Sequence, residues 1–353
     1  MPTSHLIFLG TYTRTGTSKG IYSLRLDDES GALSAPGLAA EAGDPGWIVL
    51  SPDRRFLYAI HPSPGQATVY RVDPAAGRLV PLSAPTDGPR AAPPSHLAVD
   101  ATGRTLLAAN YAEGYVAAIP IRADGTLGSP RVIKHEGRSV HPTRQGKPYV
   151  HSVTLSPDNR FVIVADLGVD RIYSYALDLV NATLAPGAVP FVATAPGAGP
   201  RHFRFGLDGR HAYAINELDN TIVAYDYDLR TGALAPKQTA ATLPPGFAEP
   251  TTTAEIRLHP NGRFLYGSNR GHDSIAVFAI DPASGALRLL EIVASGGQTP
   301  RNFALSPDGK WLVCGHQGTD LLTVFRVDAA TGRLTRTPHT AAVPTCICVL
   351  FYD

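Results

Sequence analysis

Short runs of alternating hydrophobic and polar residues follow one another along the chain, separated by turns. In GPRHFRFGLDGRHAYAINE (residues 199–217), the runs HFRF and HAYAI flank LDGR, a turn with Gly beside Asp. Alternation with a period of two predicts a β-strand, and a Gly/Asp turn between two such runs predicts an antiparallel hairpin. The repeating segments lack the three-to-four-residue spacing of an amphipathic helix, so we expect an all-β protein.

The same pattern recurs seven times along the chain. Each copy is an alternating strand that ends near Asp, then a turn that usually contains Gly, then a Leu that opens another strand, as in TIVAYDYDLRTGAL and SIAVFAIDPASGAL. A second hairpin, with turns such as SPDG and HPNG, precedes six of the seven copies. The opening leucines are 46 to 57 residues apart, at Leu33, Leu79, Leu127, Leu184, Leu234, Leu287 and Leu334.

Four short strands in each period of about 50 residues are typical of a β-propeller blade. The seven copies therefore predict a seven-bladed β-propeller, formed as a single domain by residues 1–353. The first copy has only LIFLGTYT before it, whereas the last residues, TCICVLFYD, form a lone apolar strand. We expect residues 345–352 to complete the N-terminal blade and close the ring, because closure removes two unpaired strand edges.

Charged side chains gather where the inner hairpins open, away from their turns. Arg201 and Glu217 each lie eight residues from the turn centre at Gly209, so we expect them to face each other. A similar count from the turn at Gly262, seven residues back to Glu255 and eight forward to Arg270, leads us to expect that these two residues also face each other. Convergent polar groups at a concave mouth are the usual sign of a binding site. Around the ring this edge also carries His151, His202, Asn269, Arg301 and Asn302.

The widest interval, 57 residues, contains an extra segment, HEGRSVHPTRQGKPYVHS, before the inner strand of its blade. This segment is expected to emerge at the same edge, beside His151. The sequence leaves open whether it is a lid that carries Arg144 and Gln145 or a tolerated insertion.

Composition narrows the classes of partner. The chain has 31 basic and 30 acidic residues, without the cationic excess that non-specific nucleic-acid binding requires. No apolar stretch is long enough for a membrane span, and the start lacks the basic region of a secretory signal. Three cysteines make a poor disulfide framework. We therefore expect a cytoplasmic protein that binds neither nucleic acid nor membrane; its oligomeric state stays open.

Several of these segments resemble the propeller-type lactonase family, which includes bacterial 6-phosphogluconolactonases and fungal carboxymuconate cyclases. The resemblance extends over nearly the whole chain, through HSVTLSPD, GPRHFRFGLDGRHAYAINEL, SNRGHDSI and PRNFALSPDGKWL. It implies a seven-bladed propeller. Its cyclase branch implies four catalytic residues, which match His151 in HSV, Arg201 in GPRH, Glu217 in NE and Arg270 in SNR.

The resemblance implies hydrolysis of a small anionic sugar lactone, above all 6-phosphoglucono-1,5-lactone, without a cofactor. His151 and Glu217 are the two candidates for the general base. Arg201 and Arg270 are the candidates for stabilising the oxyanion. The expected substrate-binding shell consists of His202, Asn269, Glu255, Arg301, Asn302 and Arg144.

Three alternatives remain open at this point. The same residues suit a cyclase, in which a substrate carboxylate adds across a double bond, and a propeller can also be a binding platform without catalysis. A metal-dependent lactonase would use oxygen ligands, for which the mouth offers Glu255, Asn216, Asn269 and Asp166. The arginines at the mouth would repel a cation, so we expect no metal and instead an ion pair between Glu255 and Arg270.

Overall fold

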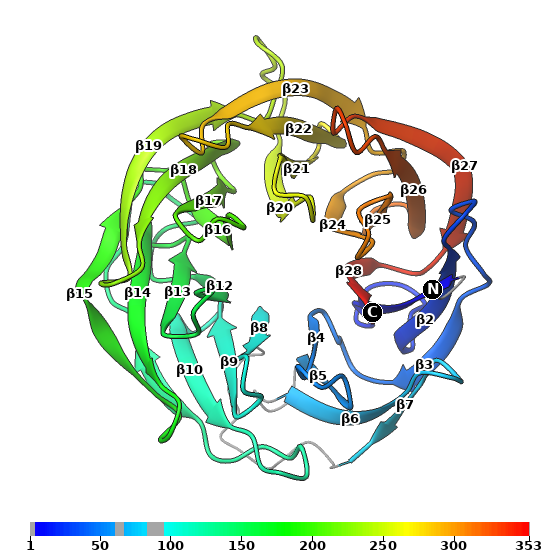
Figure 1. The fold of residues 1–353 in the computed structure, drawn as a ribbon, viewed down its shortest axis with the longest axis horizontal. Coiled ribbons are helices and arrows are strands. Elements are labelled where there is room, and N and C mark those ends of the chain that lie inside the picture. The colour runs from blue at the N-terminus through cyan, green and yellow to red at the C-terminus, as the bar shows by residue number, and fades with distance from the viewer. Residues whose placement is uncertain (1–3, 61–66, 83–94, 353) are drawn as a thin grey trace.

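The computed structural model describes residues 4–60, 67–82 and 95–352, and Figure 1 shows them as a ring of blades around a central axis. In this part of the chain the regular elements are β-strands, which form seven four-stranded antiparallel sheets. The predicted seven-bladed propeller is therefore confirmed. No helix among the described residues has the length and apolar character needed to span a membrane.

Six blades are each made of four consecutive strands, which follow one another from the axis outward. Blades 2 to 4 consist of β4 (Ile48–Leu50), β5 (Phe56–Ile60), β6 (Ala67–Asp73) and β7 (Arg78–Pro81); β8 (His96–Val99), β9 (Thr105–Asn110), β10 (Tyr115–Pro120) and β11 (Arg131–Lys134); and β12 (Val150–Leu155), β13 (Phe161–Asp166), β14 (Arg171–Asp178) and β15 (Thr183–Ala193). Blades 5 to 7 consist of β16 (Pro200–Phe205), β17 (His211–Asn216), β18 (Thr221–Asp228) and β19 (Ala233–Ala241); β20 (Thr252–Leu258), β21 (Phe264–Arg270), β22 (Ser274–Ile280) and β23 (Leu287–Ala294); and β24 (Pro300–Leu305), β25 (Trp311–His316), β26 (Leu321–Val327) and β27 (Leu334–Ala342).

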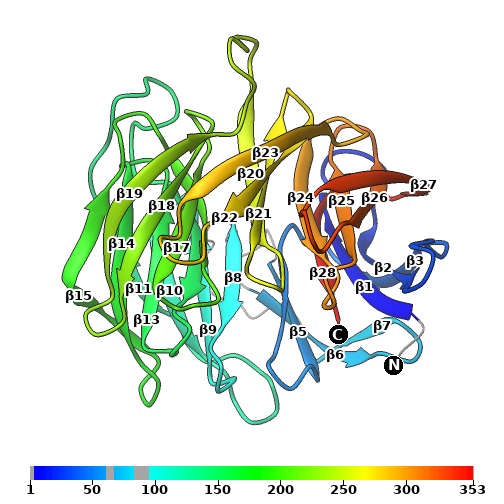
Figure 2. The same cartoon turned by 45° about the horizontal axis from the view of Figure 1, so that its top comes forward.

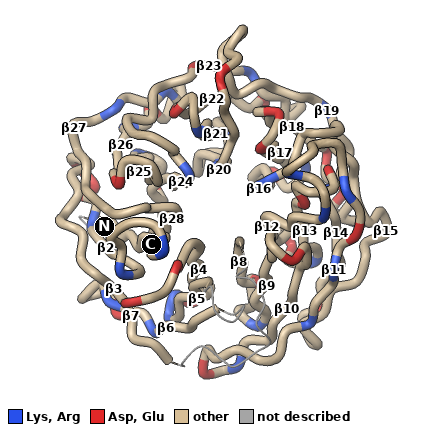
Figure 3. Tube along the Cα trace, turned by 180° about the vertical axis from the view of Figure 1, so that it is seen from behind, with Lys and Arg blue, Asp and Glu red and all other residues tan. Residues whose placement is uncertain are grey.

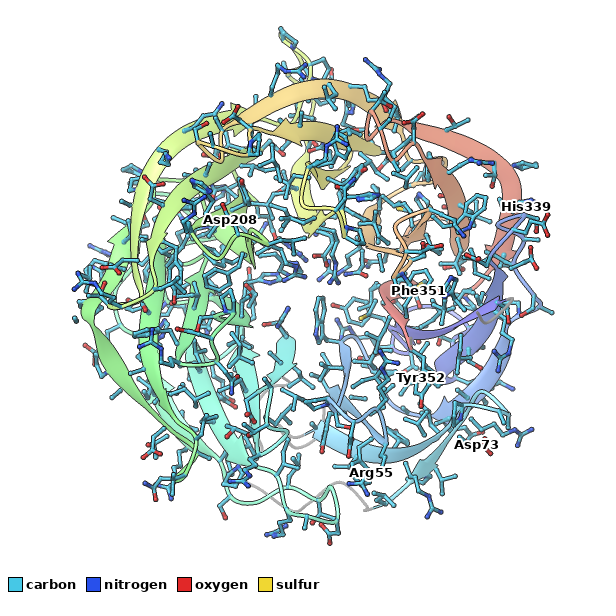
Figure 4. The ribbon with its side chains drawn as sticks, in the orientation of Figure 1. Arg55, Asp73, Asp208, His339, Phe351 and Tyr352 are labelled. Atoms are coloured by element: carbon cyan, nitrogen blue, oxygen red, sulfur yellow. The ribbon has the colours of Figure 1, made fainter. Side chains whose placement is uncertain are left out.

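Blade 1 closes the ring with strands from both ends of the chain. From the axis outward it contains β28 (Cys346–Phe351), β1 (Ser4–Thr11), β2 (Gly20–Asp27) and β3 (Gly37–Glu41). β28 pairs antiparallel with β1, so that Cys348 lies opposite Gly10. Figure 4 labels Phe351 and Tyr352 at the end of this closing strand. The predicted closure by residues 345–352 is thus confirmed.

Burial decreases from the second strand of each blade to the outermost strand. Every residue of β13 and of β17 is buried, whereas most residues of the outer strand β15 are not. The second strand is covered by its two neighbours in the sheet and by a blade on each face, as the tilted view in Figure 2 shows. This explains why runs such as HAYAI are almost entirely apolar or neutral, since both faces of the strand are buried.

Adjacent blades are joined by a contact that repeats around the ring. The hydroxyl of Tyr213 in blade 5 donates to the carbonyl of Gly285 in blade 6 over 2.9 Å, and Tyr266 in blade 6 bonds to Gly332 in blade 7 over the same distance. Gly285 has a φ of +68°, and a Cβ at this position would lie 2.4 Å from the ring of His211. The glycine of these outer turns is thus required by its backbone conformation and by the close packing of two blades.

Candidate active site

β-Bulges at one end of the inner strands direct three side chains into the central mouth. The register of β16 against β17 shifts between Pro200 and His202, which makes Arg201 the unpaired residue. Equivalent shifts occur at His151 in β12 and at Arg301 in β24. A bulge re-aims the side chain of its extra residue, and all three of these residues line one cavity.

The cavity has a volume of about 420 Å³ and receives side chains from all seven blades. Five arginines and two carboxylates line it, which leaves an excess of three positive charges when the histidines are neutral. Elsewhere basic and acidic positions are mixed around the ring (Figure 3). The lining residues are Tyr12, Arg14, Asp44, Gly46, Trp47, Ile60, Ser95, Tyr111, Ala112, Arg144, His151, Arg201, His202, Glu217, Thr252, Arg270, Arg301 and Ile347.

Glu217 is the centre of a cluster of arginines. Its Oε2 lies 2.8 Å from Arg201 Nε and 3.1 Å from Arg270 Nη2, while its Oε1 accepts a hydrogen bond from Arg144 Nη2. The expected Arg201–Glu217 pairing across the hairpin is therefore confirmed. Burial by itself would raise the pKa of Glu217, but the charges of Arg270 and Arg201 outweigh burial and hold that pKa well below its usual value. Glu217 is consequently a carboxylate at neutral pH.

Arg201 is held rigidly inside this cluster. It is only 2% exposed, and its Nη1 donates to the carbonyl of Ala254 over 2.7 Å and lies 3.1 Å from His202 Nε2. Burial, followed by the neighbouring charge of Arg270, lowers the pKa of Arg201 to about 9. The side chain thus remains a cation at neutral pH, with little freedom to reorient. Such a preorganised donor suits the stabilisation of a developing negative charge.

His151 lies beside Glu217 as a buried, neutral imidazole. Its Nε2 is 3.9 Å from Glu217 Oε2, and its Nδ1 is buried without a hydrogen-bond partner. Burial and the nearby charge of Arg201 lower the pKa of His151 well below its usual value. Because the ring carries no proton beyond its single N–H at neutral pH, one nitrogen is available to accept a proton.

The inserted segment, residues 135–149, which we call the strap, is tied to blade 4. His135 Nδ1 lies 2.7 Å from Asp166 Oδ2, and the fully buried Gln145 donates to the carbonyl of Leu167 over 2.8 Å. These bonds bring Arg144 to the cavity, where its side chain is 36% exposed. The strap therefore adds a guanidinium to the site and is anchored by buried hydrogen bonds.

Arg301 is the arginine of the cavity whose charge is least neutralised. Its Nη2 donates to the hydroxyl of Tyr12 over 3.3 Å, and its guanidinium carbon lies 5.6 Å from the centre of that ring. Within the described ranges, no carboxylate forms an ion pair with Arg301. The guanidinium is therefore available to an anionic ligand.

The expected ion pair between Glu255 and Arg270 is wrong. Glu255 Oε1 lies 2.9 Å from Arg204 and 3.2 Å from His202 Nδ1, whereas Arg270 pairs with Glu217. The hairpin count failed because it was one residue out of symmetry: Glu255 is seven residues from Gly262 and Arg270 is eight. The position of blade 6 that corresponds to Arg201 is Ala254, and Glu255 corresponds to His202. Glu255 is fully buried and does not line the cavity.

Two asparagines expected in the substrate-binding shell lie behind the cavity lining as well. Asn302 donates to Glu255 Oε2 and accepts a 2.8 Å hydrogen bond from the backbone of Val349. Asn269 bonds to Thr242 and Ser274 within its own region of the ring. Their polar atoms thus hold strands together and do not face the cavity.

His202 connects the cavity to the buried Glu255. With its Nε2 next to an Arg201 N–H and its Nδ1 next to a carboxylate, the neutral ring fits best with its proton on Nδ1. The N–H at Nδ1 does not point at the Glu255 oxygen. The contact between His202 and Glu255 is therefore a close polar contact and not a strong hydrogen bond. Burial, followed by the charges of Arg201 and Arg204, lowers the pKa of His202 well below its usual value.

Sequence reasoning missed several residues of the cavity. Arg14 and Asp44, whose side chains pair over 2.7 Å, come from connecting loops that the hairpin count does not reach. Tyr111 had a detectable signal, because it follows Asn110 in the way that Glu217 follows Asn216 and Arg270 follows Asn269. All three residues that follow these asparagines line the cavity.

Potential metal ligands cluster outside the cavity. Among the described residues, one group brings three such side chains within reach of a single ion: His5, Asp28 and Asp308. Lys310 Nζ lies 2.9 Å from both aspartates and supplies the positive charge at that position. Within the cavity, the carboxylates of Asp44 and Glu217 already pair with arginines.

Known proteins resemble the whole chain in sequence and in fold. A family model described as the lactonase, seven-bladed β-propeller family matches residues 6–351. A 6-phosphogluconolactonase of Bacillus subtilis is 38% identical over 353 residues, which covers 99% of each chain. The structure of a periplasmic gluconolactonase of Pseudomonas aeruginosa has 35% identity and a TM-score of 0.92, with 99% of each chain covered. A protein of Lactobacillus plantarum gives the same TM-score and coverage at 32% identity.

The match therefore extends over the propeller as a whole, including the strands that carry the arginine cluster. With 99% coverage and identities above 30%, the resemblance is far stronger than a shared fold. The chain belongs to the lactonase family of seven-bladed β-propellers.

Proposed function

We propose that this protein hydrolyses a phosphorylated sugar lactone, 6-phosphoglucono-1,5-lactone, to 6-phosphogluconate. The observation that carries the proposal is the cavity itself, in which an excess of three positive charges surrounds a buried neutral histidine. A lactone needs a base, an oxyanion site and, when phosphorylated, a counter-charge. The name of the Bacillus subtilis relative supports the same substrate.

His151 is the general base of this proposal. A water molecule next to its ring attacks the lactone carbonyl, and the imidazole takes the proton of that water. A new carbon–oxygen bond forms to the water oxygen, and the carbonyl electrons move to its oxygen. The ring carbon–oxygen bond then breaks, and the imidazolium returns the proton to the departing ring oxygen. Nδ1 is buried, so Nε2 is the nitrogen that exchanges the proton.

Glu217 is poorly suited to the role of base because its pKa lies well below the usual value. A carboxylate that is stabilised by three guanidinium groups has little affinity for a proton. Its role in the proposal is to hold Arg201, Arg270 and Arg144 in position. Arg201 and Arg270 then stabilise the tetrahedral oxyanion.

The phosphate is bound by Arg144 and Arg301 in this proposal. Arg301 has no carboxylate partner within the described ranges, and Arg144 is the most exposed of the three arginines on Glu217. Guanidinium groups bind phosphate oxygens through paired N–H donors, so both residues can supply directional bonds as well as charge.

We further propose that the protein acts in the cytoplasm on a sugar phosphate of the pentose phosphate pathway. Cys314, Cys346 and Cys348 are buried and free, which suits a reducing compartment. The name of the Pseudomonas aeruginosa neighbour assigns that protein to the periplasm, so fractionation of the native cell is the direct test. Recovery with the periplasmic fraction would contradict this part of the proposal.

A comparison of two lactones tests the proposed reaction. Rates with 6-phosphogluconolactone and with gluconolactone are measured side by side and corrected for spontaneous hydrolysis. We expect the phosphorylated lactone to react faster, with a difference that shrinks as salt screens the phosphate. His151→Gln should abolish the enhancement for both lactones. Equal enhancement of both would contradict the phosphate site, and no enhancement of either would favour the cyclase or a binding protein.

A further inference from the structure

The strap and the segment that leads into the inner strand of blade 5 meet at one carboxylate, that of Asp170. This residue lies in the turn between β13 and β14, with a φ of +52° and only 4% of its surface exposed. Its side chain accepts four hydrogen bonds of 2.5 to 2.7 Å, two from each of these segments. The donors are Ser139 and Gln145 of the strap and the backbone N–H groups of Gly197 and Gly199.

Both segments lead directly to an arginine of the cavity. Gln145 is adjacent to Arg144, and Gly199 lies two residues before Arg201. The two arginines contact opposite oxygens of Glu217, Oε1 and Oε2 respectively. Asp170 is therefore the common anchor for two segments whose guanidinium groups meet again at Glu217.

The hydrogen bond from a backbone N–H to the aspartate of the turn recurs in other blades. Asp273 and Asp320 occupy the equivalent turns in blades 6 and 7, and they accept the backbone N–H of Thr299 and Thr345. These threonines, like Gly199, lead into an inner strand of the next blade. The bond from Asp170 to Gly199 thus belongs to the general architecture.

The hydrogen bonds from the strap are particular to Asp170. Among the equivalent aspartates, its carboxylate alone accepts side-chain donors from an inserted segment in the described structure. Ser139 and Gln145 use one oxygen each, and Gln145 is fully buried. A carboxylate accepts all four donors at once because it has two acceptor oxygens and no proton.

We propose that Asp170 is a positioning residue for substrate recognition: it fixes the strap so that Arg144 stands where the anionic group of the substrate binds. This inference rests on the proposed function. It names Asp170 as a residue on which the enzyme's preference for a charged lactone depends. Asp170 acts through Arg144 and touches no substrate.

The substitution Asp170→Asn replaces one acceptor oxygen by an N–H group, which faces donors and breaks the network. We expect the KM for 6-phosphogluconolactone to rise about tenfold, the loss associated with one charge-assisted contact. The KM for gluconolactone should change less than about threefold, since that lactone has no phosphate for Arg144 to bind. Asp320→Asn is the matched control, and it should leave both KM values near those of the native protein.

A double-mutant cycle with Arg144→Gln distinguishes positioning from general destabilisation. If Asp170 acts through Arg144, adding Asp170→Asn to Arg144→Gln should raise the KM for the phosphorylated lactone no further. Independent, multiplying effects of the two substitutions would overturn the inference. So would an Asp170→Asn variant that behaves like Asp320→Asn.

Amide hydrogen exchange gives a readout that does not depend on activity. Asp170→Asn should increase exchange across residues 135–149, while Asp320→Asn should leave that segment protected. Unchanged protection of the strap in Asp170→Asn would overturn the inference whatever the enzyme does. The strap could loosen in Asp170→Asn while the native protein hydrolyses neither lactone. In that case Asp170 does anchor the strap, but the proposed substrate is wrong and the role of Asp170 in phosphate recognition is overturned.

Discussion

Arg201 Nε lies 2.8 Å from Glu217 Oε2, and both side chains are almost completely buried. The two residues are at the ends of neighbouring strands in blade 5, where a bulge places Arg201 outside the regular pairing. A buried ion pair of this kind costs desolvation on both sides and stabilises the fold only weakly. Both residues line the cavity, which indicates a functional reason for the presence of the pair.

The first prediction concerns the shape of Arg201. Arg201→Lys keeps the positive charge but cannot maintain the contacts to Glu217, Ala254 and His202 from one planar group. We expect kcat/KM for 6-phosphogluconolactone to fall by about 100- to 1,000-fold, the usual effect of losing one oxyanion donor. Arg210→Lys, at an exposed turn, is the control and should retain full activity. Native activity in both variants would remove Arg201 from the mechanism.

The second prediction concerns pH. As a base, His151 must be unprotonated, and its pKa lies well below the usual value. Activity is therefore lost only when the pH falls through that lowered pKa, so kcat/KM should stay level from neutral pH down to about 6.5, the unperturbed histidine value, and fall at more acid pH. A fall that begins above the usual histidine pKa would contradict this assignment.

Titration of the histidine by NMR separates the charges that act on it. Arg201→Gln removes a positive neighbour and should raise the pKa of His151, whereas Glu217→Gln removes a negative neighbour and should lower it. Shifts in the same direction in both variants would mean that repacking, and not charge, controls the ring.

The third prediction is that the reaction needs no metal. The cavity carboxylates pair with arginines, and the excess of positive charge opposes a divalent cation. Prolonged dialysis against EDTA should leave the rate unaltered. Loss of activity that returns with one divalent cation, but not with sodium chloride of equal ionic strength, would favour a metal-dependent lactonase.

The fourth prediction separates two reasons for glycine in the turns of the blades. Gly285 and Gly209 have similar φ values, +68° and +65°, but a Cβ on Gly285 meets the His211 ring while one on Gly209 meets nothing within 4 Å. Gly209→Ala should therefore cost about 1 kcal/mol of unfolding free energy from backbone strain alone. Gly285→Ala should cost roughly 2–4 kcal/mol, because strain and a clash at a blade interface add. Equal costs in urea denaturation would show that the interface adapts to the methyl group.

The local pattern along the chain was sufficient to predict the architecture. Alternation with period two, seven copies of one unit and the lone strand TCICVLFYD at the end led to seven blades and to closure by β28. These features are local, because strand alternation and turn residues depend on a few neighbouring positions. The pairing of Arg201 with Glu217 also followed, since it needs only a symmetrical count from one turn.

The tertiary structure decided everything that depends on register and on contacts between blades. Glu255 contacts Arg204 and His202 of blade 5 and not Arg270, because a count that is one residue out of symmetry selects a side chain on the opposite face of the strand. The bulges at His151, Arg201 and Arg301, which direct these side chains into the cavity, also could not be predicted from a local pattern.

The other features of the cavity that could not be predicted from the sequence depend on long-range contacts. Neither the junction of the strap with Asp170 nor the joining of Arg144, Arg201 and Arg270 at Glu217 follows from sequence spacing, because these residues come from three different blades and an insertion. Burial lowers the pKa of His151, whereas the charges of Arg270 and Arg201 hold down the pKa of Glu217 although burial alone would raise it. Only the closed ring creates that burial, so the sequence determined the blades, and the ring that they form determined the chemistry of the cavity.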